Sequence, residues 1–349
     1  MELVVLALAL VIILVGAELF TNGIEWFGRK LELAEGAVGS VLAAVGTALP
    51  ETMIPLVAIL FGAGVAADEI GVGAILGAPF MLSTLAMFVT GIAVLLAARS
   101  RPAGDVMPVN AHVLAHDMRY FAVAYAIAIG AALLPADLAP PRWAAAALLL
   151  GIYAWYVKAH FEADPDVDAE DLAPLRFRRL DRWAIRAEPT IPRLRVVNLQ
   201  VLFALGCIVV GAVAFVDAVE TIATHIGVDG TLLALVIAPI ATELPEKFNS
   251  VIWVRQGKDT LAMGNITGAM VFQSAIPTSV ALLFAGEAWS IGPGSYTAFA
   301  SAGIAFVSSA AIFLPMARAG RLRGRSLLVG GIFYLAYLGL VLTVVVGGT

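Results

Sequence analysis

The sequence has little charge and almost no cysteine. Only 13% of its 349 residues are Asp, Glu, Lys or Arg, whereas a soluble domain carries about 25%. This shortage excludes an ordinary soluble domain. The one cysteine, Cys207, excludes an internal disulfide, and we expect it to fill space within an apolar run. The chain also has no nucleotide-binding motif that would indicate a pump.

Hydrophobic residues dominate instead, at 61% of the chain. Most of them fall in segments of about 20 residues, the length that crosses a bilayer. The first segment lacks the basic start and small-residue cleavage site of a signal peptide, so we interpret it as a membrane span. The sequence predicts an all-α polytopic membrane protein with ten transmembrane helices, at 2–23, 37–62, 69–97, 119–136, 142–160, 197–223, 231–254, 260–285, 296–316 and 326–347.

The positions of Lys and Arg predict the orientation. Loops after odd-numbered spans are basic, whereas loops after even-numbered spans hold only Arg142. Because basic loops stay in the cytoplasm, we expect both termini outside the cell membrane and the longest loop, 161–196, inside. That loop is acidic and then basic, which favours a solvated linker over a Ca²⁺ loop. His112 and His116 fall in another cytoplasmic loop, where solvated side chains are favoured over a metal site or pH sensor.

The two halves of the chain resemble each other at an offset of 195 residues. GTALPE at 46–51 aligns with ATELPE at 241–246, and the similarity extends to the neighbouring spans. Each half then holds five spans, and an odd number gives the two copies opposite topology. We therefore expect two inverted five-helix repeats with discontinuous helices at the midplane, as in secondary transporters. The expected domains are 1–160 (α-repeat 37–97), the loop 161–196, and 197–349 (α-repeat 231–285).

The paired LPE elements predict an ion site. Pro50 and Pro245 cannot donate backbone hydrogen bonds, and each frees a carbonyl four residues earlier. Within a membrane such carbonyls must be satisfied or line a polar cavity. Beside the hydroxyls and carboxylates of Thr47, Glu51, Thr242 and Glu246, they form clusters of hard oxygen donors. Such clusters suit Ca²⁺ or Na⁺, and intramembrane carboxylates at matching positions favour function over packing.

At these residues the chain resembles the calcium/cation antiporter superfamily of sodium/calcium exchanger-like membrane proteins, whose repeats carry a G-T-S-x-P-E element followed by a polar helix. The resemblance implies exchange of Ca²⁺ against Na⁺ or H⁺ by alternating access, with the two glutamates as principal ligands. Thr47, Glu51, Thr242 and Glu246 stand at the ligand positions of the family. On the following helix, Asn265 and Gln273 keep polar side chains in the second repeat only.

Glu243 and Lys247 depart from the family pattern and have no charged counterpart in the first repeat, which has Ala48 and Thr52 there. They are four residues apart, in the orientation that favours a helical ion pair. One interpretation makes Lys247 a fixed cation of the site, with Glu243 as a further ligand. Such a lysine could replace a Na⁺ or exchange a proton. The other interpretation has Lys247 extending towards the cytoplasm, about 12 Å of helix short of Arg255.

The favoured function is a secondary cation antiporter, with Ca²⁺ exchanged against Na⁺. The alternative is exchange of Ca²⁺ or another cation against H⁺, or of Na⁺ against H⁺, with Lys247 as a fixed charge. An intramembrane enzyme with paired acids is less favoured, because Asp217, near a span end, is the one aspartate within the spans. We expect inorganic cations and the lipid bilayer as partners, with neither a cofactor nor nucleic acid.

Overall fold

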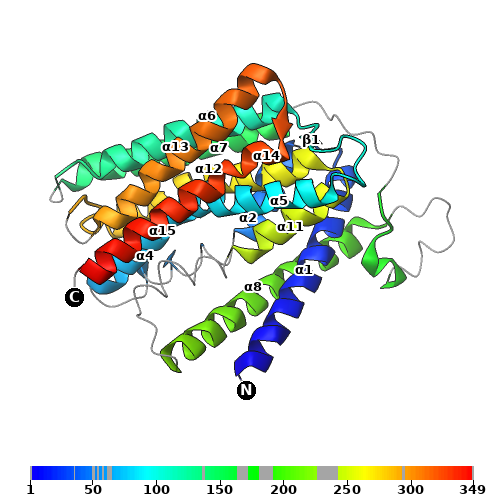
Figure 1. Ribbon diagram of the computed structural model, residues 1–349, viewed down its shortest axis with the longest axis horizontal. Coiled ribbons are helices and arrows are strands. Elements are labelled where there is room, and N and C mark those ends of the chain that lie inside the picture. Colours follow the sequence, from blue (N-terminus) through cyan, green and yellow to red (C-terminus); the bar gives the residue numbers. More distant parts are fainter. Residues whose placement is uncertain are drawn as a thin grey trace.

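The computed structural model is almost entirely helical (Figure 1). Its described residues are 2–34, 36–48, 52, 55–56, 59–60, 65–135, 138–162, 172–180, 192–225, 243–292 and 295–347. Within them, seven helical segments are long and apolar enough to cross a membrane. The protein is therefore an integral multi-pass membrane protein.

In the first half, helices α1, α4 to α5 and α7 overlap the predicted first, third and fifth spans, and α4, η2 and α5 form one continuous segment. Short π-helices, η1 and η2, interrupt the regular helices, as is frequent at functional positions. The elements are α1 (Glu2–Lys30), η1 (Ala37–Ala43), α2 (Ala44–Thr47), α4 (Val65–Met81), η2 (Leu82–Ala86), α5 (Met87–Ala97), β1 (Val106–Met107), α6 (Ala111–Ala131) and α7 (Ala139–Phe161).

The remaining elements lie in the described part of the loop at 161–196 and in the second half of the chain. Its α13 ends where Gly320 adopts a left-handed conformation, a common C-terminal cap. The elements are η3 (Arg176–Leu180), α8 (Leu194–His225), α11 (Leu244–Arg255), α12 (Asp259–Phe284), α13 (Tyr296–Ala319), β2 (Leu322–Arg323), α14 (Gly324–Leu327) and α15 (Val329–Gly347). Most of the predicted seventh span, 231–254, lies outside the described residues.

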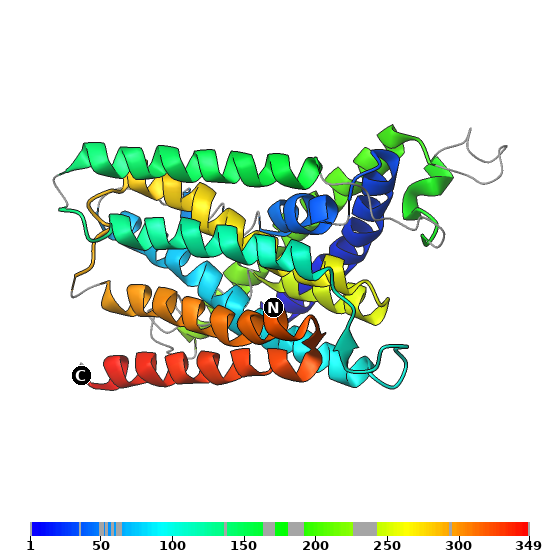
Figure 2. The same ribbon diagram turned by 90° about the horizontal axis from the view of Figure 1, so that it is seen from above.

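Helix α12 forms the centre of the bundle. Nearly all of its residues from Asp259 to Leu282 are buried, because α6, α7, η1, α11 and α4 pack around it. Helices α7 and α15 lie at opposite edges of the bundle (Figure 2). A helix enclosed on all sides has no need of a polar face, which explains why α12 mixes apolar residues with small and hydroxyl side chains throughout. Polar residues of α12 therefore point into the protein rather than into lipid.

Helices α1 and α8 pack along each other and cross the rest of the bundle at a steep angle (Figure 1). Gly211 allows this close approach, since a Cβ atom there would lie 2.8 Å from the Ile13 side chain. At one end Glu25 of α1 accepts a hydrogen bond from Trp253 Nε1 (2.8 Å) and pairs with Lys258. These contacts join α1 to the last turn of α11 and to the connection between α11 and α12.

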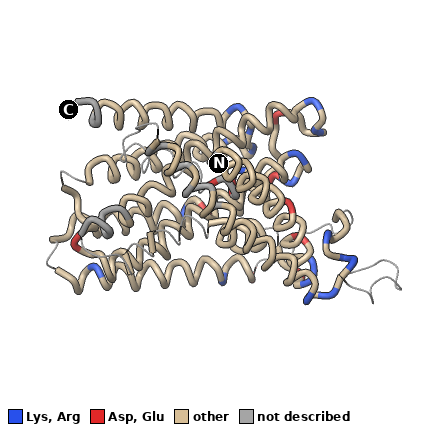
Figure 3. Tube along the Cα trace, turned by 90° about the horizontal axis from the view of Figure 1, so that it is seen from below, with Lys and Arg blue, Asp and Glu red and all other residues tan. Residues whose placement is uncertain are grey.

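The connections after the predicted odd-numbered spans meet at one end of the molecule. Strands β1 and β2 pair antiparallel and so join the connections after α5 and α13. Arg101 forms a buried ion pair with Asp259 and thereby joins the connection after α5 to the start of α12. Most Lys and Arg residues gather at this same end (Figure 3). Arg142 lies at the other end, where it donates to Ser290 Oγ at 2.9 Å.

The predicted bounds were wrong at the fourth span. We expected a helix over 119–136, with His112 and His116 in a solvated loop. Helix α6 instead begins at Ala111, because the Asn110 side chain caps it by accepting hydrogen bonds from two backbone N–H groups of the first turn. His112 is exposed as expected, but His116 is half-buried and lies beside Asp117 and His160.

Candidate functional site

Five of the seven predicted site residues lie in the described part of the chain. The other two, Glu51 and Thr242, fall outside the described residues, as does Pro50. The five described side chains are all buried, and they come from three helical elements: α2, the start of α11, and α12. They are Thr47, Glu243, Glu246, Asn265 and Gln273.

Three of these residues form one hydrogen-bonded group. The Thr47 hydroxyl lies 3.1 Å from Oδ1 of Asn265, and Nδ2 of Asn265 donates to the backbone carbonyl of Glu246 at 3.4 Å. Thr47 is also 3.1 Å from the carbonyl of Ala43, one turn earlier. Asn265 therefore connects the end of α2 to the start of α11, which are far apart in sequence. The group gathers hydroxyl, amide and carbonyl oxygens, the donors that hard cations prefer.

Gln273 lies two turns further along α12. Its Nε2 atom donates to the hydroxyl of Thr52 at 3.0 Å, and Thr52 in turn donates to the carbonyl of Ala48 at 2.6 Å. Thr52 directly follows Glu51 in sequence. Gln273 thus contacts the first LPE region, while Asn265 contacts both regions.

Glu243 and Lys247 form a buried ion pair. Nζ of Lys247 lies 3.0 Å from Oε2 of Glu243, and the exposed fractions of the two side chains are 6% and 2%. Lys247 therefore does not extend to the aqueous surface, which removes that interpretation. Glu243 is the residue just before α11, whose first turn also contains Glu246. An intact buried pair suits this position, because either charge alone would be costly to bury.

Asn249 is a buried polar residue that comparison of the two repeats does not reveal. It lies on α11, three residues after Glu246 and therefore on the same side of the helix. Its side chain is fully buried, and among the residues that the structure describes neither of its amide atoms has a hydrogen-bond partner. In the sequence, Asn249 could have been found only as a polar residue within an apolar span. Its aligned residue in the first half is the apolar Ile54, so the repeat does not point to it.

Comparison with known proteins establishes the family. The model of the sodium/calcium exchanger protein family matches residues 1–161 and 197–346. Because these stretches make up most of the chain, the chain belongs to the sodium/calcium exchanger protein family, whose members are cation antiporters and not enzymes. This excludes the intramembrane enzyme considered from the sequence.

Individual relatives agree with this assignment. CaxA of Alkalimonas amylolytica, described as an antiporter candidate, is 26% identical over 333 residues, which cover 95% of this chain and 94% of CaxA. The uncharacterised membrane protein MJ0091 of Methanocaldococcus jannaschii is 42% identical over 57 residues, 16% of this chain and 19% of that protein.

Solved structures show a similar fold. The sodium-calcium exchanger NCX_Mj, soaked with 2.5 mM Na⁺ and 1 mM Sr²⁺, superposes with a TM-score of 0.72 at 16% identity and covers 97% of both chains. The structure of NCX_Mj soaked without Na⁺ and Ca²⁺ gives a TM-score of 0.70 over 97% of this chain and 98% of that chain. At this sequence identity, the similarity to NCX_Mj shows a shared fold.

Proposed function

We propose that this antiporter exchanges Ca²⁺ against Na⁺ by alternating access, at a site around Thr47, Glu246 and Asn265. The observation that carries the proposal is the convergence of these residues from α2, α11 and α12 in the enclosed centre of the protein. We further propose that the predicted ten spans form two inverted repeats, which bring the first and second LPE elements together at the midplane. Glu51 and Thr242 would complete the ligand set.

The chemistry of the group supports a hard cation. Ca²⁺ takes six to eight oxygen ligands from carboxylates, carbonyls and hydroxyls, and Na⁺ uses the same kinds of donor. Thr47 and Asn265 offer neutral oxygens, and Glu246 offers a carboxylate within the same enclosed region. A bound cation stabilises a buried carboxylate, because it offsets the cost of removing the negative charge from water.

The Glu243–Lys247 pair supports a second possibility for the counter-ion. A buried ammonium within one helical turn of Glu246 adds a fixed positive charge beside the proposed site. Such a charge would take the place of a co-transported Na⁺, or would release a proton when Ca²⁺ arrives. Exchange against H⁺ is therefore the alternative that this pair favours.

Ion flux in proteoliposomes separates the two modes. Purified protein is reconstituted with Ca²⁺ outside, and uptake is measured under an outward Na⁺ gradient or an outward H⁺ gradient, with the membrane potential clamped. Uptake driven by the Na⁺ gradient alone supports the leading proposal. Uptake driven by the H⁺ gradient alone would replace it with the alternative, and the absence of uptake under both gradients would overturn Ca²⁺ transport.

A further inference from the structure

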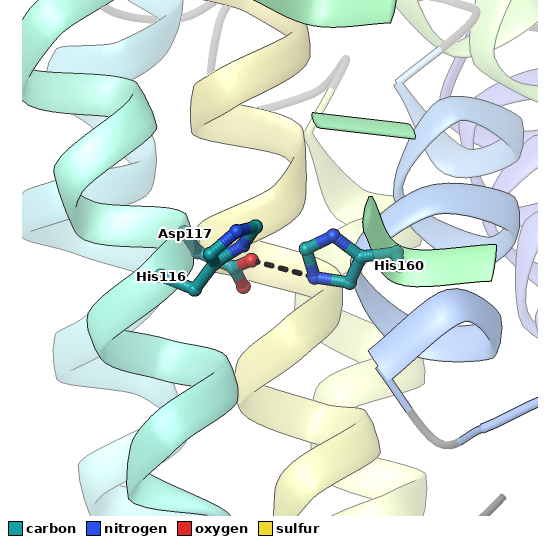
Figure 4. A group of neighbouring side chains, drawn as sticks. All are labelled: His116, Asp117 and His160. Carbon is teal, nitrogen blue, oxygen red and sulfur yellow. Dashed lines mark ion pairs between the residues drawn. The ribbon is translucent and has the colours of Figure 1, made fainter. Parts of the chain in front are cut away.

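A second polar cluster lies outside the proposed transport site, where α6 begins and α7 ends. It consists of His116 and Asp117 on α6 and His160 on α7 (Figure 4). One ligand atom from each of these residues can be chosen so that all three lie within 4.8 Å of one another. We propose that these three residues bind a transition-metal dication such as Zn²⁺.

The hydrogen bonds of His160 leave one ring nitrogen directed at a carboxylate. Its Nδ1 lies 3.1 Å from the carbonyl of Tyr156, and because a carbonyl can only accept, Nδ1 carries a proton. In a neutral imidazole, Nε2 then carries a lone pair, yet it lies 3.1 Å from Oδ1 of Asp117. Two acceptors at that separation require either a second proton or a cation between them. A metal ion at this point uses both atoms as ligands.

The surroundings of Asp117 match the support that a metal ligand needs. Ser40 Oγ donates to Oδ2 of this fully buried carboxylate at 2.8 Å, and Thr267 Oγ1 also contacts Oδ2. The Tyr156 hydroxyl lies 3.0 Å from Oδ1. Metal-bound carboxylates and histidines are held by such outer hydrogen bonds. Asp117 is therefore fixed in position, and His160 is oriented by its own backbone contact.

His116 completes the set from the more accessible side. It is half-buried, and its ring lies 5.0 Å from that of His160 and 4.6 Å from that of Tyr120. Ligands of a four-coordinate Zn²⁺ are about 3.4 Å apart, from bond lengths of about 2.1 Å. The proposed site therefore requires the half-buried His116 ring to move closer to the other two ligands. Two nitrogens, one oxygen and a water molecule make a typical Zn²⁺ site.

The donor set distinguishes this site from the transport site. Imidazole nitrogen selects borderline transition metals, whereas the group around Thr47 and Asn265 offers only oxygens. The site also touches the transport elements, because Ser40 belongs to η1 just before α2, and Thr267 lies two residues after Asn265 on α12.

Metal titration of the full-length protein tests the site. Zn²⁺ binding is measured by calorimetry, and Co²⁺ is used as a spectroscopic probe, on the Glu246→Gln protein in excess Ca²⁺, so that the transport site does not contribute. His116→Gln removes one ligand, and His112→Gln is the matched control, an exposed histidine one turn away on the same helix. The result therefore does not depend on the proposed function.

We expect one Zn²⁺ per chain and a four-coordinate Co²⁺ spectrum in the parent protein and in His112→Gln. Affinity should fall at least tenfold in His116→Gln, since even outer-shell changes cost about 10–100-fold. Equal affinity in His116→Gln, or no saturable binding in the parent, would overturn the proposal. The Co²⁺ spectrum of the parent protein is a second test that does not depend on how the variants fold. A six-coordinate spectrum there would also overturn the proposal.

Discussion

Asn265 links the two halves of the proposed site through its two amide atoms, one towards the Thr47 hydroxyl and one towards the Glu246 carbonyl. Asn265→Ala would leave both partners buried without this contact, at a cost of about 1–3 kcal/mol. We expect Ca²⁺ affinity, measured by calorimetry on purified protein, to fall by about tenfold or more. Asn198→Ala, at a half-exposed position on α8, is the control and should leave affinity unchanged. Normal affinity in Asn265→Ala would remove Asn265 from the site.

Lys247 is tested by removing it alone or together with its partner. Lys247→Met leaves Glu243 as an uncompensated buried charge, which costs about 3–5 kcal/mol, whereas Glu243→Gln with Lys247→Met removes both charges. We expect a clear fall in the thermal unfolding temperature for the single variant and partial recovery in the double variant.

The exposed pair of Lys158 and Glu162 has the same four-residue spacing and supplies the control. Lys158→Met should change the unfolding temperature little, because exposed pairs contribute about 0–1 kcal/mol. An equally small effect of Lys247→Met would contradict the burial of the pair.

At the scale of residues, the sequence drew attention to the two LPE elements and to polar residues close to them, but it missed Asn249 and the contact between His116 and His160. Thr47 and Glu246 stood out because each belongs to an LPE element. Asn249 did not, since its aligned residue is Ile54. His116 and His160 are 44 positions apart in the sequence, and only the packing of α6 on α7 brings them together.

At the scale of elements, the contact between η1 and α12 depends on Gly268. A Cβ atom there would lie 2.0 Å from the Ser40 carbonyl oxygen and 2.5 Å from its Cα atom, so the backbones themselves would have to separate. We expect Gly268→Ala to lower the unfolding temperature and the yield of monodisperse protein, since overpacking costs about 1–3 kcal/mol or more.

Gly130 on α6 provides the matched control for this change. It is also helical, but a Cβ atom there meets nothing within 4 Å. Gly130→Ala should therefore be neutral or stabilising by up to about 1 kcal/mol, from helix propensity. Equal unfolding temperatures for the two alanine variants would contradict the close contact of α12 with η1.

Hydrophobic segments predicted most helices to within a few residues, because lipid requires long apolar runs. Helices α1 and α6 were exceptions: α1 continues to Lys30 beyond its predicted end at residue 23, and the first turns of α6 carry His112, His116 and Asp117 and resembled a loop. The π-helices were also missed, because no simple composition signals the extra residue in a turn.

At the scale of the whole molecule, the basic connections lie at one end, as the distribution of Lys and Arg indicated (Figure 3). Which end faces the cytoplasm stays a prediction. Cysteine labelling on a Cys207→Ser background tests it in intact cells with a membrane-impermeant maleimide. Leu133→Cys, at an exposed position beyond the other end of α6, should be labelled from outside.

Arg178→Cys, at an exposed position of η3, should be labelled only after permeabilisation. The reverse pattern would invert the predicted topology. Such an inversion would leave the fold and the arrangement of the site unchanged, because both sites are defined by contacts within the bundle.

The proposed transport mechanism depends on Glu246 as a principal ligand of the transported cation. The most direct measurement is Ca²⁺ uptake into proteoliposomes under the coupling gradient, for the unmodified protein, Glu246→Gln and the control Glu287→Gln, whose side chain is exposed between α12 and α13. We predict normal uptake in the control and at least a tenfold loss in Glu246→Gln, which keeps the size of the side chain but removes its charge. Uptake by Glu246→Gln at the rate of the unmodified protein would contradict the central claim.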